Sequence, residues 1–121
     1  ITNTTSIVFC VATSVMPSSV LSIDLLSIVM PTSSLSAMTL MSKQDSSAPF
    51  SGWNVQTSGS GYIYSQLVNT YSSNTLEMRT TNSTNFSDGT WHHVVTTYDG
   101  TSTPAGVHIY FDGKDIALTT S

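Results

Sequence analysis

The chain has 121 residues, enough for one domain and too few for two. Ser and Thr contribute 41 residues, charged residues only 8% and hydrophobic residues 39%, a composition that excludes a charged disordered tail and a coiled coil. The net charge is −4 and the three cations, Lys43, Arg79 and Lys114, are scattered, which argues against nucleic-acid binding and docking on an anionic membrane. No apolar run reaches the roughly 18 residues that membrane insertion requires.

Apolar and polar residues alternate with a period of two along most of the chain, as in strands with one buried and one wet face. Short turn clusters containing Gly separate these runs, and no long helical pattern appears. The Asp112-Gly113 pair between two alternating runs predicts a tight type I′ hairpin. The fold class is therefore all-β, an antiparallel sandwich or barrel. The predicted strands lie at about 6–12, 20–29, 36–43, 50–57, 61–68, 74–81, 91–98, 105–111 and 114–119.

The first 35 residues follow this pattern less clearly. Val15 to Met30 carries apolar residues on both faces, interrupted by Ser and Pro17, which fits a fully buried strand. It fits equally a stretch that is not the natural sequence of this domain.

A long motif near the C-terminal end suggests a family. Residues 87–100 read Ser-Asp-Gly-Thr-Trp-His-His-Val-Val-Thr-Thr-Tyr-Asp-Gly, and residues 106–113 read Gly-Val-His-Ile-Tyr-Phe-Asp-Gly. Together with Leu40-Met41-Ser42-Lys43-Gln44-Asp45 and Gly52-Trp53-Asn54-Val55, they resemble the laminin-G-like branch of the concanavalin A-like lectin/glucanase superfamily. The resemblance covers residues 36–119, whereas residues 1–35 diverge from the family pattern. It implies one jelly-roll β-sandwich domain over residues 1–121, with His92–Tyr98 in an interior strand.

Glycoside hydrolysis would require two carboxylates on either side of the scissile bond. The chain has a single Glu, Glu77, with no Asp within ten residues of it. Asp112 and Asp115 flank a hairpin turn, and turn chemistry explains Asp112 more simply. We therefore expect no enzymatic activity.

The adjacent His92 and His93 point to opposite faces of a strand, so they cannot bind one ion together. In the resembling family this pair is a fold signature, and we expect one imidazole to be hydrogen-bonded inside. His108 is expected to face solvent. The places of Trp53 and Trp91 in the family motifs imply packing roles.

Calcium requires carboxylate and carbonyl oxygens on loops, and several members of this superfamily bind it. The loop Asp residues do not form a closely spaced run, and most precede Gly as ordinary turn residues. A single weak calcium site at Asp45 or Asp99 remains open, and no other cofactor is expected.

Sugar recognition uses aromatic faces together with amide or carboxylate groups. Tyr62, Tyr64 and Gln66 share one face of a predicted strand, and Tyr71 lies in the next turn. These four residues are the candidate ligand site, although half-covered strand surface explains them too.

The resemblance implies a non-catalytic recognition or adhesion module that binds a glycan or a protein surface, outside cells or on a cell or virion surface. A purely structural surface or virion decoration domain is the alternative, and a glycoside hydrolase relative is a third. Because the chain stops before the closing strands of the family, we expect an uncovered sheet edge and a homo-oligomer. The competing expectation is a closed monomer in which the N-terminal residues take the positions of the family's closing strands.

Overall fold

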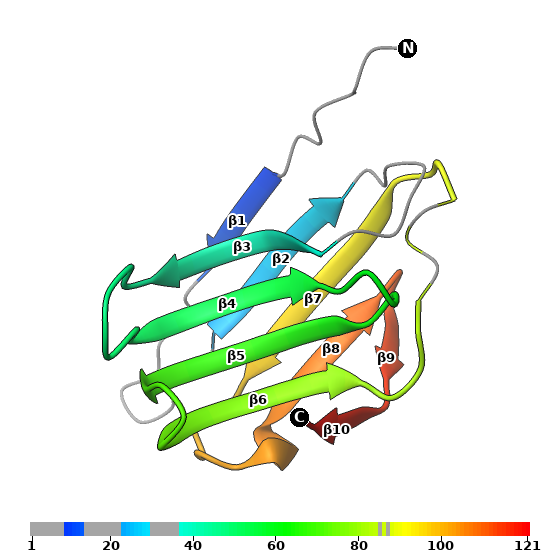
Figure 1. Cartoon of the computed structure of the whole chain (residues 1–121). Coiled ribbons are helices and arrows are strands. Elements are labelled where there is room, and N and C mark those ends of the chain that lie inside the picture. The colour runs from blue at the N-terminus through cyan, green and yellow to red at the C-terminus, as the bar shows by residue number, and fades with distance from the viewer. Residues whose placement is uncertain (1–8, 14–22, 30–36, 85, 87) are drawn as a thin grey trace.

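The computed structural model describes residues 9–13, 23–29, 37–84, 86 and 88–121, with the side chains described from residue 37 onward. Two five-stranded antiparallel sheets lie face to face, and their strands cross at an angle (Figure 1). This confirms the predicted all-β antiparallel sandwich. Within the described ranges, no helix is long and apolar enough to cross a membrane.

The first sheet has the order β1-β2-β7-β8-β9, and the second has the order β10-β6-β5-β4-β3. Strand β7 is thus the central strand of the first sheet, as the sequence predicts for His92–Tyr98. A short 3-10 helix, η1 (Pro104–Gly106), precedes β8. The strands are β1 (Phe9–Thr13), β2 (Ile23–Val29), β3 (Met38–Gln44), β4 (Gly52–Thr57), β5 (Ile63–Thr70), β6 (Asn74–Thr80), β7 (His92–Tyr98), β8 (Val107–Phe111), β9 (Lys114–Ile116) and β10 (Leu118–Thr120).

The prediction of one strand over residues 114–119 is wrong. The chain pairs with β8 as far as Ile116 and then crosses at Ala117 to the other sheet, where Leu118 pairs with Thr80 of β6. A run of alternating residues carries no signal for a change of sheet, because both halves keep an extended backbone.

The core lies between the two sheets and is built by alternation along the strands. Val55 and Ile63 of the second sheet, and Val94 and Ile109 of the first, are all at most 2% exposed. In β3 the pairing register shifts between Thr39 and Met41, so that two consecutive residues, Leu40 and Met41, are both buried.

The turn between β8 and β9 is the predicted hairpin. Asp112 and Gly113 have φ values of 49° and 77°, and positive values at both central positions are what a type I′ turn requires. The Asp112 carboxylate also contacts His92 and accepts from the His93 backbone N–H.

Candidate functional site

A row of polar side chains crosses four strands on the face of the second sheet that points away from the core. It consists of Gln44, Asn54, Gln66 and Glu77, from β3, β4, β5 and β6, which stand opposite one another in the strand pairing or close to it. The Asn54 amide nitrogen donates to Gln44 Oε1 at 3.0 Å and to Gln66 Oε1 at 2.7 Å. Gln66 Nε2 in turn donates to the Glu77 carboxylate. We call these four residues the polar row.

One acceptor of the polar row has no partner. Asn54 is 7% exposed, and its Oδ1 atom is buried without a hydrogen bond. Both N–H groups of its amide donate along the row, and no member of the row donates to Oδ1 in return. A buried acceptor without a donor costs about 1–3 kcal/mol.

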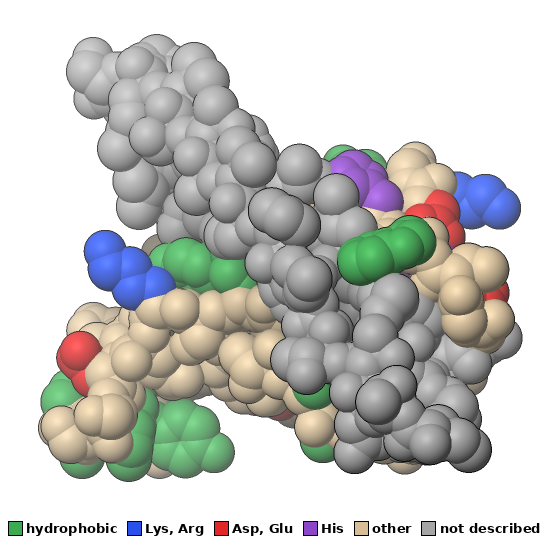
Figure 2. All heavy atoms as spheres, turned by 90° about the horizontal axis from the view of Figure 1, so that it is seen from above, with side chains coloured by type: hydrophobic (Ala, Val, Ile, Leu, Met, Phe, Trp, Pro, Cys, Tyr) green, Lys and Arg blue, Asp and Glu red, His purple; other side chains and the backbone are tan. Residues whose placement is uncertain are grey.

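An exposed aromatic pair lies at the Gln44 end of the polar row. The rings of Phe50 and Tyr71 meet edge to face with centroids 6.0 Å apart, and they are 38% and 57% exposed. Gln44 Nε2 donates to the Phe50 carbonyl at 2.9 Å, which connects the row to this pair. Figure 2 shows hydrophobic side chains gathered at the end of the molecule where the β3–β4 and β5–β6 loops lie.

Two hydrogen bonds, one of them from a side chain, hold the two aromatic loops together. The Tyr71 N–H donates to the Pro49 carbonyl at 3.0 Å, and the Ser51 hydroxyl donates to the Asn69 carbonyl at 2.7 Å. Phe50 has a φ of 59°, a left-handed conformation that costs a bulky residue about 1–2 kcal/mol. These contacts hold the Phe50 ring exposed and in a fixed position beside Tyr71.

A shallow pocket of about 390 Å³ connects the aromatic pair to the other end of the polar row, since both Tyr71 and Glu77 line it. Its volume lies within the roughly 300–1,000 Å³ typical of small-molecule sites. Tyr71 and Glu77 are the members of the aromatic pair and the polar row that line this pocket, and Pro104, Thr120 and Ser121 form part of its other walls.

The structure brings the predicted ligand residues to this region, with different roles. Gln66 belongs to the polar row and Tyr71 to the aromatic pair. Tyr64 lies opposite Arg79 in the pairing of β5 with β6, and the Arg79 guanidinium sits 4.7 Å from the centroid of the Tyr62 ring. Tyr62 and Tyr64 therefore flank the row beside Arg79.

Sequence reasoning missed Gln44, Asn54, Glu77 and Phe50 as members of this site. Gln44, Asn54 and Glu77 occupy the polar positions of their alternating strands, and this alternation is the one sequence feature that indicates their place on the outer face. Which polar positions align across strands depends on the pairing register, and a single strand does not contain it. Phe50 carries no local signal at all.

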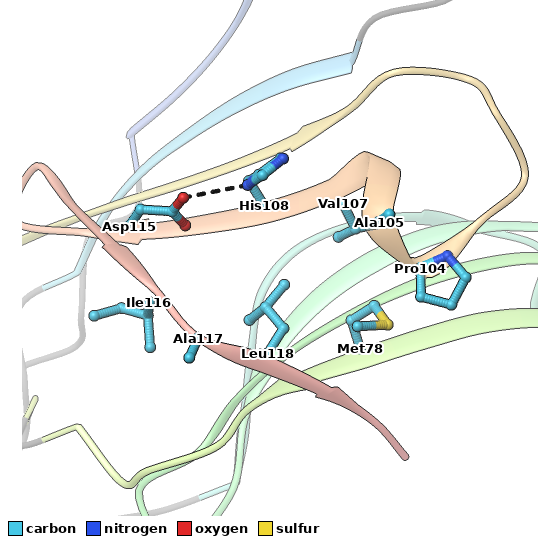
Figure 3. Close-up of a pocket in the computed structure, with 9 residues that line it drawn as sticks. All are labelled: Met78, Pro104, Ala105, Val107, His108, Asp115, Ile116, Ala117 and Leu118. Atoms are coloured by element: carbon cyan, nitrogen blue, oxygen red, sulfur yellow. Dashed lines mark hydrogen bonds and ion pairs between the residues drawn. The ribbon is translucent and has the colours of Figure 1, made fainter.

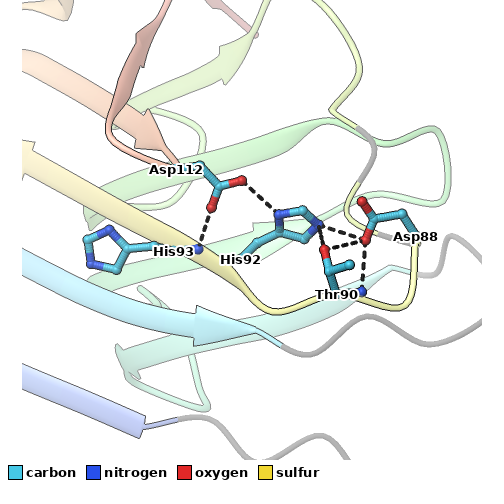
Figure 4. Close-up of polar contacts among 5 residues, drawn as sticks. All are labelled: Asp88, Thr90, His92, His93 and Asp112. Carbon is cyan, nitrogen blue, oxygen red and sulfur yellow. Dashed lines mark hydrogen bonds and ion pairs between the residues drawn. The ribbon is translucent and has the colours of Figure 1, made fainter.

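A second polar cluster surrounds His92, whose side chain is 8% exposed (Figure 4). Its Nδ1 lies 2.8 Å from Asp112 Oδ2 and its Nε2 lies 3.1 Å from Asp88 Oδ1. The ring also packs on Phe111, with centroids 4.7 Å apart. These contacts join the β6–β7 loop and the β8–β9 hairpin to β7. We call Asp88, Thr90, His92 and Asp112 the His92 cluster.

The two carboxylates of the His92 cluster have lowered pKa values. The Thr90 hydroxyl, and after it the Thr90 backbone N–H, lower the pKa of Asp88 by donating to its Oδ1 atom. The His93 backbone N–H is the main cause of the lowered pKa of Asp112, followed by the His92 ring.

These lowered pKa values predict an acid-sensitive fold. A carboxyl whose pKa is lower in the folded chain contributes stability above its unfolded pKa, near 3.8, and that stability is lost as the pH falls through the folded pKa. We expect the free energy of unfolding, measured with urea, to decrease below about pH 4. In the combined Asp88→Asn and Asp112→Asn variant, the free energy of unfolding should decrease less between pH 4 and lower pH. A decrease equal to that of the parent chain would contradict the assignment.

The histidine predictions are confirmed. His92 is buried and hydrogen-bonded, its neighbour His93 is exposed on the opposite face, and His108 is exposed. Trp53 packs against the core as expected. The expectation that Trp91 packs is wrong: the residue is 54% exposed, because it precedes β7 and lies outside the strand pairing.

The two candidate calcium ligands stand apart as single carboxylates. Asp45 is exposed at the start of the β3–β4 loop, and Asp99 Oδ1 accepts from the Thr101 backbone and hydroxyl at 2.9 and 2.7 Å. In the part of the chain that the structure describes, no three His, Cys, Asp or Glu residues gather in a way that could hold a metal ion. One carboxylate is far fewer than the six to eight oxygens around calcium, so these residues fit the ion poorly, and a site there stays a prediction.

Comparison with protein families identifies the class. The family model described as the concanavalin A-like lectin/glucanases superfamily, laminin G type, matches residues 25–121. The chain belongs to this superfamily, which confirms the resemblance read from its motifs. Neither the curated proteins nor the solved structures gave a match. Membership in this family suggests a binding module.

Proposed function

We propose that this protein is a non-catalytic recognition module that binds carbohydrate through the polar row and the Phe50–Tyr71 pair. The observation that carries the proposal is the exposed Phe50–Tyr71 ring pair at the end of a row of hydrogen-bonded amide and carboxylate side chains. Sugars present both the hydroxyl donors and the apolar ring faces that this combination accepts. Family membership supports a binding role, at a cell or virion surface or otherwise outside cells.

The alternatives are less well supported. Glu77 is bonded to Gln66 in the polar row and is the only Glu of the chain, so a hydrolytic carboxylate pair would need an Asp partner. A purely structural surface module would not explain a fixed aromatic pair in a strained loop. A protein surface is a second ligand class that exposed aromatic rings can bind.

The test is a glycan array followed by titration of the strongest ligand. We expect Tyr71→Ala to weaken binding about tenfold, because one aromatic contact contributes about 0.5–1.5 kcal/mol beyond its buried area. Gln66→Ala should weaken it as well, since it interrupts the row between Asn54 and Glu77.

Trp91→Ala is the matched control, because Trp91 is an equally exposed aromatic residue that precedes β7 of the other sheet. It should leave the affinity unchanged. A silent array would favour the structural alternative, and release of reducing sugar from a bound glucan would establish hydrolysis instead.

We also propose that residues 1–121 form one domain that associates into a homo-oligomer through a sheet edge. β10 pairs only with the Met78–Thr80 half of β6, and no described strand pairs with the same edge of β6 at Asn74–Leu76. Unpaired edge groups are available to a second chain. Light scattering at micromolar concentration should give a mass above 12.9 kDa; that monomer mass, unchanged on tenfold concentration, would contradict association.

A further inference from the structure

A second pocket, of about 460 Å³, opens between β8 and the chain that crosses from β9 to β10 (Figure 3). It has no residue in common with the polar row or the aromatic pair. Its lining combines apolar side chains with the polar His108 and Asp115, and the apolar Met78 and Val107 are buried, at 4% and 3% exposed. The other apolar wall residues are Pro104, Ala105, Ile116, Ala117 and Leu118.

The change of sheet at Ala117 creates this pocket. The last residue of β9 to pair with β8 is Ile116, opposite Ile109, and from there the two segments diverge. The Ala117 carbonyl accepts from the Thr81 backbone N–H at 2.9 Å and from the Thr81 hydroxyl at 3.2 Å. These bonds hold the crossing chain at the end of β6, away from β8. The methyl side chains of Ala105 and Ala117 leave the space between the segments open.

A polar pair forms the rim of the pocket. His108 Nδ1 lies 3.3 Å from Asp115 Oδ2, and the two side chains are 46% and 53% exposed. Asp115 brings a carboxylate to this rim, and its second oxygen can accept a further hydrogen bond. No Lys or Arg lines this pocket. The rim thus offers acceptors and negative charge above an apolar interior.

We propose that this pocket binds a small organic ammonium ion, with a compact apolar body of about one ring seated against Met78 and Val107. The volume lies within the roughly 300–1,000 Å³ range of ligand pockets, and the apolar wall takes up the hydrocarbon part. The ammonium group donates to the Asp115 carboxylate at the rim. A carboxylate of the same shape is repelled by Asp115, and a neutral alcohol lacks the ion pair.

The experiment is a titration of the isotope-labelled full chain, followed by amide chemical shifts. 2-Phenylethylamine and 3-phenylpropanoate serve as probes of opposite charge. We expect the amine to shift the amides of Val107 and Ala117 saturably and to bind at least tenfold more tightly than the carboxylate. Comparable binding of both probes, or no saturable shift at these amides, would overturn the proposal.

Two variants test the assigned groups. Asp115→Asn should weaken amine binding about tenfold, and Ala117→Leu should abolish it by filling the cavity. Asp45→Asn, the same charge change in a loop outside the pocket, should leave the affinity unchanged. Equal affinity in Asp115→Asn and the parent chain would overturn the role of the rim. Glycan binding through Tyr71 is a separate measurement and should survive both pocket variants.

Discussion

Gly52→Ala is expected to destabilise the fold by roughly 3–5 kcal/mol, the range of severe single substitutions. Gly52 begins β4 with a φ of 136°, and an added Cβ would lie 2.1 Å from the Lys43 carbonyl oxygen and 2.7 Å from the Gln44 Cα. Both contacts are to backbone, so no side-chain rotation relieves them. The close approach of β3 and β4 at Gly52 is also what places Gln44 beside Asn54, so glycan affinity should fall together with stability.

Gly89→Ala is the matched control for this substitution. Gly89 also has a positive φ, 82°, but a Cβ there would meet nothing within 4 Å. Its replacement should therefore cost only the left-handed backbone penalty, about 1–2 kcal/mol. Urea unfolding curves of the two variants measure the difference. Equal losses would show that backbone conformation alone, and not the β3–β4 contact, makes glycine necessary at position 52.

His92→Ala should cost about 2–4 kcal/mol, the second largest effect that we expect. The substitution removes a buried ring that packs on Phe111 and that bonds to both Asp88 and Asp112. The β6–β7 loop and the β8–β9 hairpin would lose their common attachment to β7. We expect faster proteolysis at the β6–β7 loop and unchanged proteolysis elsewhere. A general loss of core packing would instead speed proteolysis at many sites.

His93→Ala is the internal control for the His92 cluster. His93 is the adjacent residue but its side chain is exposed, and only its backbone N–H donates to Asp112. We expect a change within about 0.5 kcal/mol. A double-mutant cycle of His92→Ala with Asp112→Asn measures their coupling, and additive losses would contradict a functional hydrogen bond between them.

Several features of this protein are predictable from local sequence alone. Period-two alternation predicts the strands because side chains of an extended chain point to opposite faces, and it also separates buried His92 from exposed His93. Asp112-Gly113 predicts its hairpin because few residue pairs accept two positive φ values. The Trp-His-His motif and its following hairpin place the chain in the correct superfamily.

The candidate sites depend on contacts between residues far apart in the chain. Gln44, Asn54, Gln66 and Glu77 become a polar row only through the registers of three strand pairs. Phe50 becomes exposed beside Tyr71 through hydrogen bonds between two loops. The chain changes sheets at Ala117 through bonds to Thr81, and this opens the second pocket. Alternation determines which face a residue occupies, whereas register and loop docking determine its neighbours, and those are properties of the assembled sandwich.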